Sequence, residues 1–148
     1  MNLEELQAAV VDASVAIKLF VFEDGSEQAD RLFGHLTSDP STRFFVPDLF
    51  FIECANILWK YVQRYGYPPE NARQDVVDLQ ELALHDFPTA DLIAESLDLA
   101  LLFDVTAYDA SYAALAQRLR LPLLTADQTL AQKLAHSGID IILLRDLT

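Results

Sequence analysis

Apolar residues follow two alternating patterns along the chain: short continuous runs, and longer stretches with helical spacing. Short runs bounded by Pro, Thr or Asp are typical of buried strands. They predict strands at residues 8–12, 43–47, 122–125 and 140–144. In the longer stretches apolar residues recur every three or four positions, as Ala29, Leu32, Phe33 and Leu36 do, and this spacing predicts amphipathic helices. We expect helices at residues 15–22, 27–36, 48–65, 68–84, 90–103, 107–119 and 127–136.

This order of elements predicts an α/β fold. Strands that alternate with helices form a parallel sheet with helices on both faces. The sequence has no internal repeat, no low-complexity tract and no linker rich in Pro, Gly or Ser, and its 148 residues are a usual size for one domain. We therefore expect a single domain over residues 1–148.

Composition excludes several other classes of protein. A hydrophobic fraction of 52% is too high for a disordered chain, and no apolar run approaches the roughly 18 residues of a membrane-spanning helix. The acidic start, MNLEELQAAVVDAS, does not resemble a signal peptide, so we expect a cytoplasmic protein. The four glycines stand singly, which excludes the clustered glycines of a P-loop or a dinucleotide-binding loop.

Thiol and soft-metal chemistry are not indicated. Cys54 is the only cysteine and stands in a strongly apolar segment, as a buried thiol does. His35, His85 and His136 are far apart and match no zinc spacing. The chain also shows no Ser–His–Asp arrangement for covalent catalysis.

The charge balance argues in two directions. The chain has 23 acidic and 10 basic residues, a net charge of −13, which disfavours nucleic-acid binding through Lys and Arg. Most of these carboxylates are expected to form a soluble acidic surface. A few that converge on a bound Mg²⁺ would have the opposite effect, because the ion inverts the local charge and attracts phosphate.

Four acidic residues are predicted to meet at one edge of the sheet. Ligands of parallel sheets bind outside the carboxyl ends of the strands, where Asp12 ends the first strand and Asp127 follows the strand at 122–125. Glu53 interrupts an apolar helical stretch, a costly place for a carboxylate unless something satisfies it. Asp109 begins the helix at 107–119 and can project over the same edge.

Each acid also has an ordinary structural explanation. Asp12 suits a turn, Asp127 a helix cap and Asp109 a favourable contact with a helix dipole. Together these explanations weaken, because two unit charges about 4 Å apart repel by roughly 4 kcal/mol at an effective dielectric constant near 20. A hard divalent ion removes that repulsion, and carboxylate oxygens are ligands that Mg²⁺ or Mn²⁺ prefers.

Three segments of the chain resemble a known family. They are DASVAIKLF at residues 12–20, PDLFFIECANIL at 47–58 and TAYDASYAALAQRLRLPLLTAD at 106–127. In order and spacing they are similar to the PIN-domain nucleases, above all to the bacterial VapC-type toxins of toxin–antitoxin pairs. The resemblance implies a three-layer α/β/α sandwich with a central parallel sheet, acting as a Mg²⁺-dependent endoribonuclease.

The resemblance also implies roles for individual residues. It makes the four acids the catalytic and metal-binding set, with Asp12 and Asp109 as direct ligands. Glu53 and Asp127 would complete a second metal position or hold metal-bound water. The residues that match the family's supporting polar positions are Ser14, Asn56 and Thr125.

Substrate and partners follow from the same pattern. Lys18, four residues after Ser14, and Lys60, on the helical face of Glu53, are the candidates for positioning RNA phosphates. The stretch 48–65 is apolar almost all round, which predicts burial or an interface, and family members commonly form homodimers. The resemblance further implies an antitoxin whose tail covers the site, and the net charge suits a basic partner segment.

Two other classes of function stay open. A receiver-type phosphoacceptor also gathers acids around Mg²⁺, but it normally needs a lysine after a late strand, and LLTAD and IILLRD offer none in the expected place. A catalytically idle PIN-fold module for protein association is the stronger alternative. The intact acids favour the nuclease, in which metal-activated water attacks the phosphodiester in line and leaves 5′-phosphate and 3′-hydroxyl ends.

Overall fold

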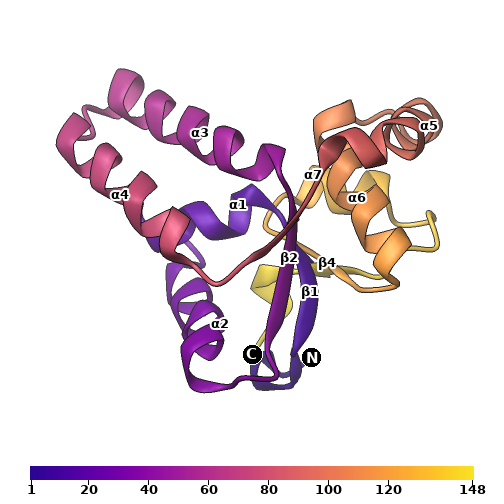
Figure 1. Ribbon diagram of the computed structural model, residues 1–148, viewed down its shortest axis with the longest axis horizontal. Coiled ribbons are helices and arrows are strands. Elements are labelled where there is room, and N and C mark those ends of the chain that lie inside the picture. Colours follow the sequence, from indigo (N-terminus) through magenta and orange to yellow (C-terminus); the bar gives the residue numbers. More distant parts are fainter.

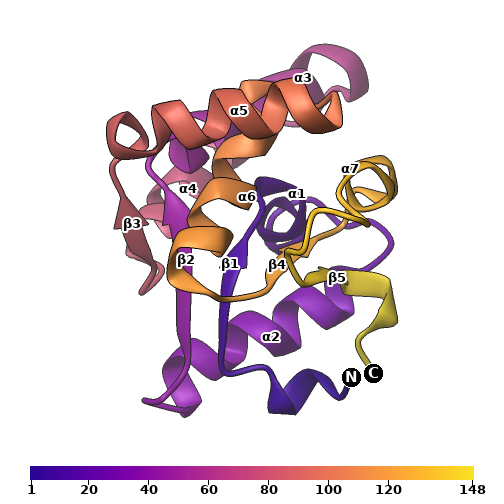
Figure 2. The same ribbon diagram turned by 90° about the vertical axis from the view of Figure 1, so that its right-hand side faces the viewer.

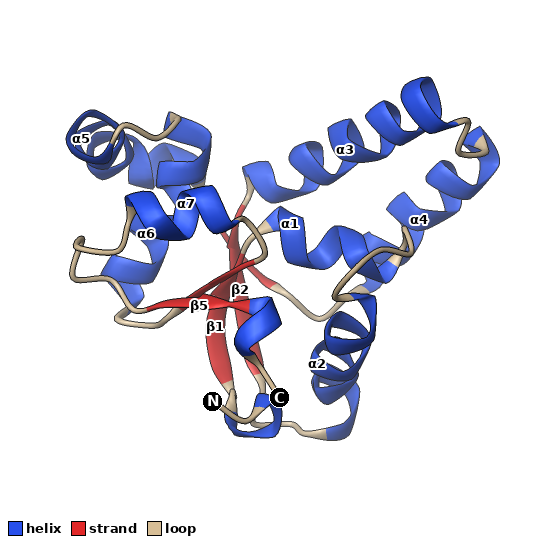
Figure 3. Ribbon diagram, turned by 180° about the vertical axis from the view of Figure 1, so that it is seen from behind, coloured by secondary structure: helices blue, strands red, loops and turns tan.

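The computed structural model describes residues 1–148 and contains one sheet of five parallel strands (Figures 1 and 3). The strands are β1 (Ala8–Val11), β2 (Arg43–Pro47), β3 (His85–Phe87), β4 (Leu123–Thr125) and β5 (Ile141–Leu143). Their order across the sheet is β3-β2-β1-β4-β5, so β1 is central and the direction of chain progression reverses between β1 and β4. Such a reversal is the switch point at which α/β sheets bind ligands.

The two central strands are buried on both faces, as strands of parallel sheets are. Every residue of β1 after Ala8 is buried, and so is every residue of β4. Val11 pairs with Leu124 in the register between these two strands. The next residues of these two segments are Asp12 and Thr125. They therefore lie side by side at the carboxyl edge of the sheet.

Helices cover both faces of the sheet, which confirms the three-layer α/β/α sandwich (Figures 1 and 2). One face carries α1 (Ala13–Ala16) and α2 (Ser26–Ser38), and the other carries α5 (Ile93–Phe103) and α6 (Ala107–Leu119). Helix α6 packs on β1 and β2, and all seven of its residues from 110 to 116 are buried. Four of those seven are alanine, so the helix approaches the sheet closely. The short α7 (Gln128–Lys133) packs against β4 and β5.

A helical hairpin, α3 (Leu49–Tyr65) followed by α4 (Pro69–Glu81), extends away from the sheet (Figure 1). Gly66 ends α3 in the left-handed region, with a φ of 68°. Cys54 is fully buried on this helix, as expected, whereas Ile52 is 71% exposed and Trp59 58% exposed. The apolar stretch is thus not fully buried in a single chain. Neither α3 nor any other helix is long and apolar enough to cross a membrane.

The structure corrects several predicted boundaries. The pattern predicts no strand at 85–87, where β3 forms the sheet edge, because the exposed His85 and Asp86 break any apolar run. Helix α4 ends at Glu81 rather than residue 84, since Leu82 already has an extended backbone. The helix predicted at 15–22 is α1 continued by a 3₁₀ turn at Ile17–Leu19, and α7 stops at Lys133 instead of 136. Three further 3₁₀ turns are too short for periodicity to detect: Leu3–Glu5, Thr89–Leu92 and Leu144–Asp146.

Candidate functional site

The floor of the candidate site lies where β1 and β4 end side by side. Asp12 is 5% exposed, and one of its carboxylate oxygens, Oδ2, accepts hydrogen bonds from two hydroxyl groups. Ser14 Oγ donates over 2.8 Å and Thr125 Oγ1 donates over 2.8 Å. Hydroxyl donors from two different segments therefore fix the direction of this carboxylate.

Each of these hydroxyl groups also accepts a backbone hydrogen bond. Ser14 Oγ accepts from the N–H of Ala126 at 3.0 Å, and Thr125 Oγ1 accepts from the N–H of Asp127 at 3.1 Å. Ser14 lies inside α1 and does not cap it, because Asp12 holds the cap position. Its hydroxyl instead joins the start of α1 to the segment after β4.

Burial governs the ionisation of Asp12. Loss of solvent raises its pKa above the ordinary value, and the nearby charge of Asp127 raises it further. The hydrogen bonds from Thr125 and Ser14 oppose this shift, because they stabilise the charged form. A carboxylate held this way is costly to ionise alone and gains strongly from a nearby cation.

One wall of the site is Glu53, which α3 brings over the sheet edge from one side. Its side chain is partly buried, and its Oε1 accepts a hydrogen bond of 2.7 Å from the hydroxyl of the buried Tyr112 on α6. Desolvation raises the pKa of Glu53 to about 7, with further contributions from the charges of Asp12 and Asp109. Sequence reasoning missed Tyr112, although a tyrosine among buried alanines needs a partner for its hydroxyl.

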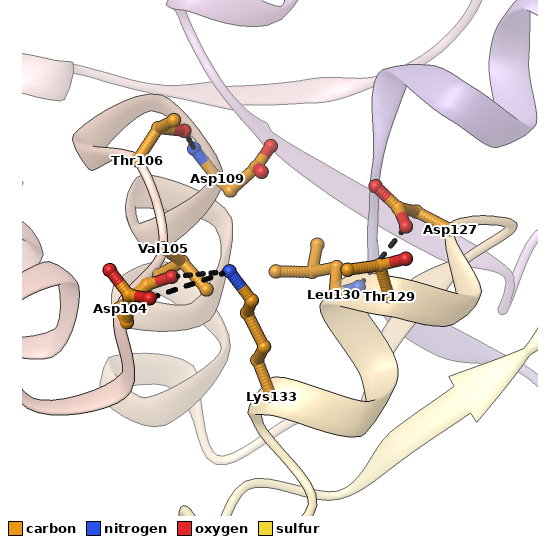
Figure 4. Close-up of a pocket in the computed structure, with 8 residues that line it drawn as sticks. All are labelled: Asp104, Val105, Thr106, Asp109, Asp127, Thr129, Leu130 and Lys133. Atoms are coloured by element: carbon orange, nitrogen blue, oxygen red, sulfur yellow. Dashed lines mark hydrogen bonds and ion pairs between the residues drawn. The ribbon is translucent and has the colours of Figure 1, made fainter.

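Asp109 and Asp127 form the other walls of the site, and both line a cleft of ≈ 280 Å³ (Figure 4). Asp109 lies in the first turn of α6, where the hydroxyl of Thr106 accepts a hydrogen bond of 3.1 Å from its backbone N–H. Burial raises the pKa of Asp109 to about 6, and the charges of Asp12 and Asp127 add to this shift. Asp127 also caps α7, which confirms the helix-cap explanation of this residue. Its side chain accepts a hydrogen bond of 3.1 Å from the backbone N–H of Leu130.

The same cleft contains a cation that sequence reasoning missed. Lys133, at the end of α7, extends into it and donates a hydrogen bond of 2.8 Å to the carbonyl oxygen of Asp104 (Figure 4). The Asp104 carboxylate lies 3.8 Å from the same ammonium group. The charge of Lys133 lowers the pKa of Asp109, which opposes the larger effect of burial. The sequence feature that could have identified Lys133 is its position on a predicted helix, six residues after Asp127.

The remaining predicted residues lie farther out. Asn56 is exposed and lines a second cleft together with Glu53 and Tyr108. The ammonium of Lys18 is engaged elsewhere: it pairs with Glu23 at 3.0 Å and donates to the carbonyl of Asp24 at 2.6 Å. Lys60 is exposed on α3, about two helical turns beyond Glu53.

The donor set fits a hard divalent cation. All four acids offer carboxylate oxygens, which such ions prefer as ligands. The negative charges also act on one another: Asp12 and Asp109 raise the pKa of Glu53, and Asp12 raises the pKa of Asp109. As the side chains stand, no three His, Cys, Asp or Glu residues are close enough together to hold one ion. Binding would therefore require the carboxylates of the walls to turn toward the floor.

Comparison with known proteins places the chain in a family. The model of the PIN domain matches residues 9–134. Ribonuclease VapC3 of Pyrobaculum aerophilum is 37% identical over 128 residues, which cover 84% of this chain and 92% of that protein. Ribonuclease VapC9 of Mycobacterium tuberculosis is 33% identical over 122 residues, covering 82% of this chain and 87% of the relative.

Solved structures support the same fold. A crystal structure of a Pyrobaculum aerophilum protein superposes with a TM-score of 0.64 at 27% identity, covering 90% of this chain and 91% of that one. A toxin–antitoxin complex from Klebsiella pneumoniae contains a chain with a TM-score of 0.64 at 19% identity, covering 92% and 97% respectively. The second likeness, at this low identity, concerns the fold alone.

Proposed function

The chain belongs to the PIN-domain family, and we propose from this premise that it is a metal-dependent endoribonuclease whose active site lies at the carboxyl ends of β1 and β4. The observation that carries the proposal is the convergence of Asp12, Glu53, Asp109 and Asp127 on that edge, with the pKa of the first three raised. The names of its VapC ribonuclease relatives support RNA as the substrate.

The four carboxylates would hold Mg²⁺, or Mn²⁺, at this edge. When bound, the ion supplies a water of lowered pKa and stabilises charge on the leaving oxygen of a phosphodiester. Asp12, fixed by Ser14 and Thr125, provides the rigid point of the site. Asp109 lines the cleft in which the RNA backbone would lie, and the hydroxyl of Tyr112 orients Glu53.

The partners follow from the surfaces of the molecule. We propose that this nuclease is the toxin of a toxin–antitoxin pair, since its relatives are VapC proteins and its net charge of −13 suits a basic segment of an antitoxin. Homodimerisation would use the exposed apolar side chains of α3, including Ile52 and Trp59. Phosphate contacts from Lys18 and Lys60 stay predictions.

The direct test is cleavage of labelled RNA in Mg²⁺, Mn²⁺ or EDTA. We expect metal-dependent products with 5′-phosphate ends, and we expect Asp12→Asn to reduce the rate by more than about 100-fold, the upper end of the losses caused by changing the outer partners of a metal site. Asp30→Asn, an exposed residue of α2, is the matched control and should cleave as the wild type does. Cyclic phosphate ends, or equal rates in EDTA, would contradict the mechanism.

The idle interaction module makes a different prediction. It requires that the purified protein neither cleaves RNA nor binds a divalent ion at this edge. Titration calorimetry with Mn²⁺ separates the two cases, because a nuclease offered the wrong RNA still binds the metal through Asp12. Loss of that binding heat in Asp12→Asn, with retention in Asp30→Asn, would support the nuclease even where no cleavage is seen.

A further inference from the structure

Positive charge is scarce around the candidate site. Of the ten basic residues, several are already paired with nearby acids: Lys18 with Glu23, Arg31 with Glu4, Arg73 with Glu70 and Arg118 with Glu95. RNA carries one negative charge per nucleotide, and phosphate contacts normally supply much of the affinity for it. An acidic nuclease therefore depends on whichever cations face its cleft.

Lys133 is the basic residue in the cleft that contains Asp109 and Asp127 (Figure 4). Its side chain rises from the end of α7, and its ammonium group lies at the far side of the cleft against the α5–α6 connection. The cleft beside Glu53 adds no cation, because it is lined by four hydrophobic residues together with Glu53 and Asn56.

The contacts of Lys133 are of a kind that a phosphate can replace. The ion pair with Asp104 is long, at 3.8 Å, and the carboxylate of Asp104 is fully exposed to solvent. Exposed ion pairs of this kind contribute little to stability, because solvent and salt screen them. The remaining contact is a single hydrogen bond to a carbonyl oxygen, and a lysine ammonium group has three donors on a flexible stem.

We propose that Lys133 binds a backbone phosphate of single-stranded RNA next to the cleavage position, with Asp104 competing for the same ammonium group. This rests on the proposed function, because it assigns a substrate contact to that site. The acids then hold the metal and the reacting phosphate, while Lys133 positions the strand on the α7 side. Asp104 lowers the affinity by holding the lysine and by repelling the strand.

The test is binding of a fluorescein-labelled 12-nucleotide single-stranded RNA, followed by anisotropy in Ca²⁺, a poor catalyst of phosphodiester hydrolysis. Lys133→Met should weaken binding about tenfold, the loss of one charge-assisted hydrogen bond. It should also reduce the slope of log K against log salt by about 0.7, as expected for one lost phosphate contact on a single strand. Arg43→Met, exposed at the opposite end of the sheet, removes the same charge and should change neither.

Two further variants separate a substrate contact from a structural one. Lys133→Arg should keep most of the affinity, and Asp104→Asn, which suits the left-handed backbone there, should strengthen binding about two- to threefold. Asp30→Asn adds the same charge change on α2 and should leave binding unaltered. In cleavage assays, Lys133→Met should raise KM while kcat changes little.

Each outcome decides one of the two proposals. If Lys133→Met binds like Arg43→Met with an unchanged salt slope, or lowers kcat and Tm with KM unchanged, the lysine is structural and this inference is wrong while the nuclease stands. If the wild type binds RNA through Lys133 but neither cleaves RNA nor binds Mn²⁺ through Asp12, the nuclease proposal fails and the phosphate contact stands. A wild type that binds no RNA in Ca²⁺ overturns the inference as well.

Discussion

The floor and the walls of the candidate site contain the same chemical groups in opposite surroundings. The floor is Asp12 with Ser14 and Thr125 at the ends of two paired strands, and of these three residues Asp12 and Thr125 are buried. The walls are Glu53, Asp109 and Asp127, which come from three helices and remain partly or largely exposed. Carboxylates of the walls each have few hydrogen-bond partners, whereas one oxygen of Asp12 has two.

The difference indicates that the floor is rigid and that the walls can move. Sheet pairing fixes the floor, so its geometry should survive changes elsewhere and fail only when the floor itself is altered. The walls are placed by helix packing and by single contacts, so they can move toward a cation or a substrate. Perturbing the floor should therefore cost more stability than perturbing a wall.

The largest effect is expected for Thr125→Val, which keeps the shape of the side chain and removes its hydroxyl. Asp12 then loses its buried hydroxyl donor and keeps that of Ser14, and the N–H of Asp127 loses its acceptor. We expect the free energy of unfolding in urea to fall by about 2–3 kcal/mol, the range for hydrogen bonds to buried charged groups. Thr37→Val removes a hydroxyl from an exposed turn of α2 and should cost much less. Equal losses in the two variants would show that the floor is no more rigid than the surface.

A smaller effect, on the walls, is expected from pH in the absence of metal. A carboxyl group whose pKa is raised on folding holds its proton more tightly in the folded state, so ionising it costs stability. That penalty is absent below pH 4 and grows as the pH rises toward about 7 for Glu53 and about 6 for Asp109. The metal-free protein should lose about 1–2 kcal/mol between pH 4 and pH 8, a figure reduced from the full shifts because solvent screens both groups.

Urea unfolding in EDTA at a series of pH values measures this loss. The double variant Glu53→Gln, Asp109→Asn should show a flatter profile, since the titrating groups of the walls are gone. Excess Mg²⁺ should also flatten the wild-type profile, because a bound cation favours the ionised carboxylates. If the wild type and the double variant show the same dependence of stability on pH in EDTA, ionising Glu53 and Asp109 does not destabilise the folded protein.

The smallest change is Tyr112→Phe, which removes one hydroxyl from a wall and leaves the buried ring in place. Glu53 loses its single side-chain donor, and we expect a cost of about 1 kcal/mol. Cleavage should slow because Glu53 is no longer oriented. Tyr61→Phe is the matched control, since the Tyr61 hydroxyl donates to the Glu23 carboxylate at 2.6 Å, outside the site. It should lower stability similarly and leave cleavage unchanged; equal slowing in both variants would remove the case for orientation by Tyr112.

The floor could be predicted from the sequence because strand ends are local features. The apolar run before Asp12, and the one before Asp127, each specify a buried strand, and the rule for parallel sheets places both ends at one edge. The structure confirms that placement, and it also brings Glu53 and Asp109 near, as the charges acting on their pKa values indicate. Their roles in metal binding stay predictions.

The missed residues depend on contacts between distant parts of the chain. Tyr112 looks like one more apolar position in an alanine-rich helix, and its pairing with Glu53 joins residues 59 positions apart. Lys133 resembles any surface lysine at a helix end until α7 is docked against the α5–α6 connection. β3 was not predicted because an edge strand with exposed polar residues has no apolar pattern. Only its pairing with β2 defines it as a strand.

The pairing of β1 with β4 also determines when the candidate site can form during synthesis of the chain. Asp12 leaves the ribosome before its hydroxyl partner Thr125, which lies 113 positions later in the chain. Contacts between such distant residues form only after the intervening chain is available. A nascent chain therefore lacks a complete floor until Thr125 has been made, and under the proposed function a fragment that ends before residue 125 should not cleave RNA.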